Sequence, residues 1–153
     1  MFFFYEYKKT YLNFSKNQIK EYYGDIENFK ITYNSHESLQ KSDFAFICSG
    51  TATLESAIIG IPFILVYKAK KLDYFIAKRL VKIEHVGLAN IMFKMMGKDP
   101  IHPELLQEEV NAKRLYEEYK NMDKELFFTK SKELKGYLQN GSSKNVANIL
   151  KKQ

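Results

Sequence analysis

Two short runs of apolar residues, FAFIC at 44–48 and FILVY at 63–67, stand out from the more mixed sequence around them. Both runs are continuous rather than alternating, which is typical of strands buried on both faces. Between them, apolar residues recur at helical spacing over 51–59. Gly60 and Pro62 follow, and such residues commonly end a helix. The pattern therefore predicts a strand, a helix and a second strand in succession.

Weaker patterns predict further elements on both sides of this unit. Before it, we expect a helix at 15–23, a strand at 29–33 and a short helix or turn at 36–42. After it, we expect a helix at 72–82, an extended stretch or loop at 85–93, a long amphipathic helix at 103–120 that opens at Pro103 with Glu104 in its first turn, a helix from Asp123 and a last helix at 142–152.

This order of elements predicts the fold class. Strands and helices that alternate, with strands apolar throughout, indicate an α/β domain with a Rossmann-like parallel sheet flanked by helices. In such sheets, ligands bind beyond the carboxyl ends of the strands. Ser49, Gly50 and Thr51 stand at one such end, between the strand at 44–48 and the following helix. We therefore expect a ligand site at this junction.

The chemistry of the junction suits a phosphate and a sugar. A helix N-terminus carries N–H groups without intrahelical partners and a partial positive charge, so it can hold an anion. Gly50 lets a ligand approach the backbone closely. Glu55 lies one turn into the helix, outside the capping-box position, where it can accept hydrogen bonds from ribose hydroxyls. Alternatively, Glu55 is a partner of the helix dipole or a surface acid, because a strand–glycine–helix junction alone is weakly specific.

Composition narrows the choice of partners only slightly. The 24 Lys and Arg against 18 Asp and Glu give a net charge of +6. This excess permits phosphate-bearing partners or an anionic membrane surface, and a lysine-rich solvated surface explains it as well. Cys48 is the single cysteine, which excludes an internal disulfide and favours a reducing compartment, with Cys48 itself a small core residue. His36, His85 and His102 show no metal-ligand spacing.

The chain has neither a signal peptide pattern nor a run of about 18 apolar residues, the minimum for a membrane-spanning helix. The expected location is cytoplasmic, or peripheral on a membrane. Residues 67–82, YKAKKLDYFIAKRLVK, interleave basic and apolar side chains. They are either a contact with anionic lipid or a surface helix packed on the sheet.

Four motifs occur in family-like order and spacing: SGTATLE at 49–55, G-x-P-x-x-x-x-Y-K at 60–68, AKRLVK at 77–82 and GLAN at 87–90. Through them, residues 42–100 resemble the C-terminal half of the lipid-A-disaccharide synthase family, and the similarity continues to about residue 150. The family more often has proline at the position of Ala89. These enzymes are GT-B glycosyltransferases that join UDP-2,3-diacylglucosamine to 2,3-diacylglucosamine 1-phosphate (lipid X), release UDP and act in lipid A biosynthesis.

The resemblance implies a nucleotide site and no metal or other cofactor. It places the diphosphate at a turn formed by Ser49, Gly50, Thr51 and Ala52, the ribose at Glu55 and the nucleotide beside Asn90. It assigns no catalytic residue to this chain. Residues 1–150 would be a partial C-terminal UDP-sugar-binding domain that begins late in the family's domain and lacks the N-terminal acceptor domain. We therefore expect a fragment that is inactive alone and peripheral on the inner membrane at most.

Other functions stay open at this point. The chain could belong to another GT-B enzyme that uses UDP-GlcNAc. It could also be a non-catalytic interaction module that forms a homodimer or complements a separate N-terminal half. A basic nucleic-acid-binding domain is a third possibility, which no RNP, zinc or helix-turn-helix pattern supports.

Overall fold

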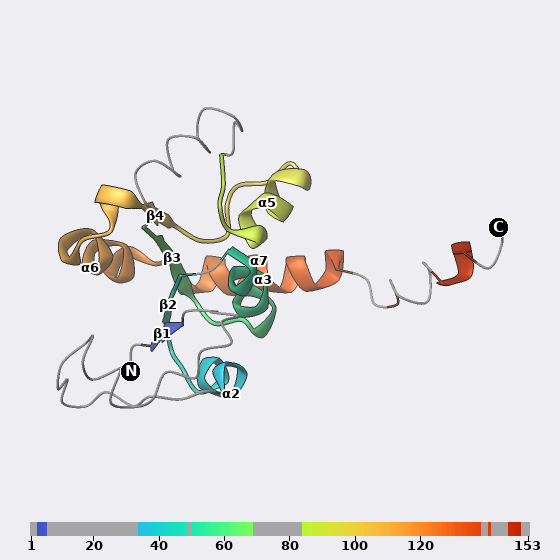
Figure 1. Ribbon diagram of the computed structural model, residues 1–153, viewed down its shortest axis with the longest axis horizontal. Coiled ribbons are helices and arrows are strands. Elements are labelled where there is room, and N and C mark those ends of the chain that lie inside the picture. Colours follow the sequence, from blue (N-terminus) through green and yellow to red (C-terminus); the bar gives the residue numbers. More distant parts are fainter. Residues whose placement is uncertain are drawn as a thin grey trace.

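The computed structural model describes residues 3–5, 34–48, 50–68, 84–138, 141 and 147–150. Its centre is a parallel sheet of four strands in the order β1-β2-β3-β4 (Figure 1). The strands are β1 Phe3–Tyr5, β2 Ala45–Ile47, β3 Phe63–Tyr67 and β4 Glu104–Leu106. Because all four run in the same direction, their carboxyl ends share one edge of the sheet.

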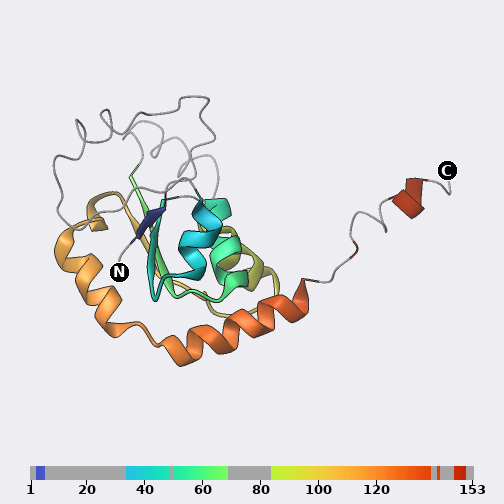
Figure 2. The ribbon, with the colours of Figure 1, turned by 90° about the horizontal axis from the view of Figure 1, so that it is seen from below.

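Helices connect the strands and follow the last one. They are α2 Ser35–Gln40, α3 Gly50–Ile59, α5 Leu88–Met95, the short 3-10 helix η1 Gln107–Glu109, α6 Ala112–Asn121 and α7 Lys124–Tyr137. In both ribbon views, α6 lies on one side of the sheet while α2, α3 and α5 lie on the other (Figures 1 and 2). The helix α7 crosses back and packs against α3.

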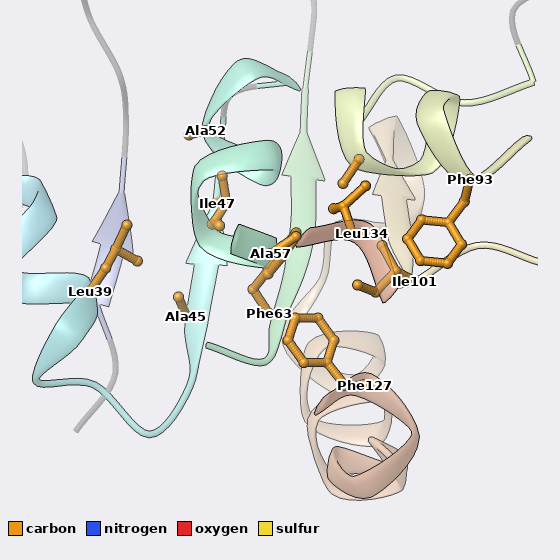
Figure 3. Close-up of a cluster of buried hydrophobic side chains, with 11 residues drawn as sticks. Leu39, Ala45, Ile47, Ala52, Ala57, Phe63, Phe93, Ile101, Phe127 and Leu134 are labelled. Atoms are coloured by element: carbon orange, nitrogen blue, oxygen red, sulfur yellow. The ribbon is translucent and has the colours of Figure 1, made fainter. Parts of the chain in front are cut away.

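The alternation of side chains along the strands divides the core into two clusters. Ala45, Ile47 and Phe63 point to the face covered by α3, α5 and α7, where they meet residues such as Phe93 and Phe127 (Figure 3). A second set points to the face covered by α6 and comprises Phe44, Phe46, Ile64, Val66 and Leu105. Burial on both faces explains why these strands are apolar throughout.

The predicted fold class is confirmed: a parallel sheet flanked by helices. The strand at 63–67 and the helix ending at Ile59 lie where the pattern placed them. Gly60 has a φ of 94°, a left-handed conformation that suits glycine and ends the helix. Asp123 caps α7, because its side chain accepts a hydrogen bond from the Leu126 N–H.

The prediction of an extended stretch or loop at 85–93 is wrong, because residues Leu88–Met95 form α5. Gly87 occupies the N-cap position and has no side chain with which to cap the helix. The acceptors come instead from distant residues: Glu104 accepts from the Gly87 N–H, and Thr53 accepts from the Ala89 N–H. The local sequence therefore carries no start signal for this helix.

The prediction of one helix over 103–120, with Glu104 in its first turn, is also wrong. Residues Glu104–Leu106 form β4 instead, paired in parallel with β3. The chain then turns at Gln107, which has a φ of 55°. The helix α6 begins only at Ala112, where the Asn111 side chain accepts from the Arg114 N–H. Pairing with β3 satisfies the backbone hydrogen bonds of this segment in an extended conformation, so tertiary pairing overrides its local preference for a helix.

Several predictions fall outside the described residues. They are the helix at 15–23, the strand at 29–33, the helix at 72–82, residue Ser49 and most of the last helix, of which 147–150 are helical. Within the described ranges, no helix has both the length and the apolar character needed to cross a bilayer.

Candidate functional site

The predicted ligand site lies where β2 ends and α3 begins, at the carboxyl edge of the sheet. The helix starts at Gly50, directly against the segment that leads into α5. A Cβ atom on Gly50 would lie 2.7 Å from the backbone oxygen of Val86, closer than real Cβ contacts allow. Gly50 is therefore needed for the N-terminus of α3 to approach the segment at 84–87.

Gly87 is held equally tightly from the other side. A Cβ atom there would lie 2.6 Å from the ring of His102 and 3.0 Å from the Glu104 carboxylate. The two glycines thus let the segment at 84–87 pass between the start of α3 and the start of β4. The N-termini of α3 and α5 are brought together by this packing, and the two helices are in extensive contact.

The Glu104 carboxylate anchors this segment. Its Oε2 accepts from the Val86 N–H at 2.7 Å, and its Oε1 accepts from the Gly87 N–H at 3.0 Å. Oε1 also accepts from the Asn90 side-chain amide at 2.7 Å. Only 9% of the Glu104 side chain is exposed. A largely buried carboxylate that accepts from three donors fixes the backbone that leads into α5.

Asn90 lies beneath this segment and is fully buried. Its Oδ1 accepts from the N–H groups of Ile101 at 2.9 Å and His102 at 3.3 Å. Its Nδ2 donates to the His102 carbonyl at 3.0 Å, in addition to Glu104. The structure thus places Asn90 next to the predicted site, with its amide engaged by the chain itself.

Thr53 couples the two helices. Its hydroxyl donates to the Gly50 carbonyl at 2.6 Å and accepts from the Ala89 N–H at 3.2 Å. Together, Thr53 and Glu104 accept hydrogen bonds from N–H groups at the start of α5. The sequence interpretation missed both residues. SGTATLE contains Thr53, but no local signal assigns its partner, and Glu104 was expected in a helix.

The ring of His102 packs against Gly87. This ring is buried and lies 4.4 Å from the Phe63 ring, centroid to centroid. Burial lowers the pKa of His102 to about 4, against a smaller opposing effect of its hydrogen bond to the Pro103 carbonyl. The ring is therefore neutral near pH 7, and Nδ1 carries the proton because it donates to that carbonyl.

The remaining predicted residues lie along α3. Thr51 and Glu55 are four residues apart and share the outer face of the helix. Ala52 is buried, so only its backbone can serve a ligand at this edge. Glu55 is partly exposed, and its Oε1 lies 3.2 Å from His36 Nδ1 on α2. Ser49 lies outside the described residues.

These contacts define what the junction can do chemically. The N–H groups at the start of α5 are engaged by Glu104 and Thr53. The N-terminus of α3 is the kind of helix end that can hold an anion. Glu55 adds an acceptor for hydroxyl groups one turn away. Among the described residues, no group of three or more His, Cys, Asp or Glu could hold a metal ion.

Known proteins resemble this chain in sequence. A family model described as lipid-A-disaccharide synthetase matches residues 2–151. The chain is 57% identical over 130 residues to a lipid-A-disaccharide synthase of Campylobacter jejuni. This match covers 85% of this chain and 36% of that protein. It is 46% identical over 138 residues to the synthase of Helicobacter pylori, covering 85% of this chain and 38% of the relative. The chain thus spans little more than a third of the length of these curated relatives. No solved structure gives a significant match.

Proposed function

The chain belongs to the lipid-A-disaccharide synthetase family, and on this premise we propose that its β2–α3 junction binds the UDP part of a UDP-sugar. The activity is that of a glycosyltransferase in lipid A biosynthesis. The donor is UDP-2,3-diacylglucosamine, the acceptor is lipid X, and UDP is released. The described residues act on the donor side of this reaction.

The proposal rests on the position of the N-terminus of α3. Gly50 brings this helix end against the fixed segment at Val86, and Glu55 follows on the outer face. The rise from Thr51 to Glu55 is about 6 Å at 1.5 Å per residue. This distance suits a ligand with a phosphate on the helix N-terminus and ribose hydroxyls beside the carboxylate.

The same geometry gives the junction its part in transfer. As the bond between the sugar and the diphosphate breaks, negative charge grows on the leaving UDP. The N–H groups and dipole at the start of α3 are fixed in place before the reaction, so they stabilise this charge without reorganising. Glu55 holds the ribose and thereby sets where the diphosphate lies.

Calorimetric titration of UDP into the chain tests the proposal. We expect Glu55→Ala to weaken UDP binding by about tenfold to a hundredfold, because hydrogen bonds to a charged group contribute about 1.5–3 kcal/mol. The matched control is Glu117→Ala, which removes a partly exposed carboxylate from α6 on the opposite side of the sheet. Equal affinities for the parent, Glu55→Ala and Glu117→Ala chains would contradict the assigned ribose site.

A further inference from the structure

We propose that His36 and Gln40, both on α2, position the Glu55 carboxylate for the ribose of the nucleotide. This inference rests on the proposed function and deepens it. It adds two positioning residues to the site, from an element that none of the sequence motifs includes. Neither residue is proposed to touch the reacting atoms.

The three side chains form a hydrogen-bonded series between two helices. Gln40 Nε2 lies 3.0 Å from His36 Nε2, and His36 Nδ1 lies 3.2 Å from Glu55 Oε1. His36 and Gln40 are four residues apart, so they share one face of α2. That face is turned to α3, which packs beside α2.

The neighbouring donor and acceptor determine the tautomer of the neutral His36 imidazole. The Gln40 amide nitrogen can only donate, so His36 Nε2 accepts from it. In the neutral ring the proton then resides on Nδ1, which donates to Glu55 Oε1. The series therefore runs from Gln40 through His36 to Glu55, with each hydrogen bond in the same direction.

This arrangement orients the carboxylate and leaves acceptor capacity for a ligand. His36 holds Oε1, while Oε2 has no hydrogen-bond partner among the described residues. Without His36, a partly exposed glutamate would sample several rotamers, and binding would have to order it. With His36, the carboxylate is already aligned when the ribose arrives.

The exposure of the His36 and Glu55 side chains distinguishes a positioning role from a structural one. The side chains of His36 and Glu55 are 59% and 36% exposed. Pairs at such exposed positions contribute little to folding stability. Removal of His36 should therefore leave the unfolding midpoint unchanged and alter only ligand binding. Removal of a purely structural residue would instead lower the midpoint.

The test compares UDP with 2′,3′-dideoxy-UDP, which lacks both ribose hydroxyls, by calorimetric titration. We expect His36→Ala to weaken UDP binding by about threefold to tenfold, the equivalent of one hydrogen bond, and to leave dideoxy-UDP binding unchanged. His36→Asn should restore most of the affinity, because its side-chain amide can donate from a position close to that of Nδ1. Gln40→Ala should weaken UDP binding less than His36→Ala. The control is Lys41→Ala, at the end of α2, whose partner is Glu37.

The outcomes distinguish this inference from the proposed function. If the parent chain binds UDP and His36→Ala binds it equally well or more tightly, the positioning role is wrong while the nucleotide site stands. Equal weakening of UDP and dideoxy-UDP would also overturn it, because the ribose would not be involved. If the folded parent chain binds no UDP, the proposed function fails and the inference fails with it.

Discussion

At the scale of single residues, a largely buried carboxylate and a buried imidazole organise the segment at 84–87. Glu104 accepts hydrogen bonds from Val86, Gly87 and Asn90, and His102 supports Gly87 from below. Both side chains come from β4 or the residues just before it. The segment at 84–87 therefore takes its shape from a strand that follows it by more than a dozen residues.

We expect Glu104→Gln to lower the free energy of unfolding by about 1–3 kcal/mol, the typical cost of a buried donor left without an acceptor. The substitution replaces one carboxylate oxygen by an NH2 group, which would face the N–H of Val86 or Gly87. Chemical denaturation measures the loss, and amide hydrogen exchange at these two residues should become faster. Glu108→Gln, at an exposed position of η1, is the matched control. An unchanged free energy of unfolding would show that the three hydrogen bonds contribute nothing net.

His102 makes folding sensitive to acid. Its pKa is about 4 in the folded chain, below the ordinary value of 6.5. The unfolded state therefore takes up a proton at a higher pH than the folded state. Stability associated with the neutral ring is fully present above about pH 6.5 and is lost as the pH falls toward about 4. At 1.36 kcal/mol per pKa unit, the loss is of order 3 kcal/mol.

The measurement is the free energy of unfolding as a function of pH. His102→Leu should flatten the curve between about pH 6.5 and 4, because the variant has no group with this depressed pKa. Parallel curves for the parent and His102→Leu chains would contradict the assignment.

At the scale of elements, the decisive feature is the close approach of α3 to the segment before α5. We expect Gly50→Ala to lower the free energy of unfolding by about 1–3 kcal/mol, the usual range for an overpacked site. The new Cβ would meet the Val86 backbone oxygen at 2.7 Å, and backbone cannot move aside as a flexible side chain can. UDP binding should weaken as well, since the helix end would shift.

Gly136→Ala is the control for this substitution. Gly136 lies in α7, and an added Cβ there would meet nothing within 4 Å. Alanine favours a helix over glycine by about 0.8–1.0 kcal/mol, so this variant should be more stable than the parent. If both alanine variants were stabilised, the close contact at Gly50 would not constrain the fold.

At the scale of the whole molecule, the proposed function gives the described residues the donor side of a transfer reaction. Transfer also needs an acceptor hydroxyl held beside the donor and a base for its proton. Neither function is assigned to a residue of this chain, which spans 36% and 38% of the C. jejuni and H. pylori relatives. We expect the 153-residue chain to bind UDP and to form no disaccharide. Incubation with radiolabelled UDP-2,3-diacylglucosamine and lipid X checks this, and disaccharide product above the background of a boiled sample would contradict it.

The sequence by itself determined the elements that rest on local signals and on long apolar runs. The strands β2 and β3, the helix between them, its end at Gly60 and the cap at Asp123 follow from burial on both faces, helical spacing and side-chain caps a few residues away. The motif SGTATLE also marked the junction that lies at the carboxyl edge of the sheet.

The tertiary structure alone decided β4, the start of α5 and the surroundings of Asn90 and Glu55. The segment at 104–106 has the pattern of a helix and becomes a strand because β3 offers a free edge to pair with. The helix α5 begins at a glycine because its caps are Thr53 and Glu104, which are 36 and 14 to 18 residues away from the groups that they bind. Hydrogen bonds over such separations depend on how the sheet brings its loops together, and no local pattern encodes that.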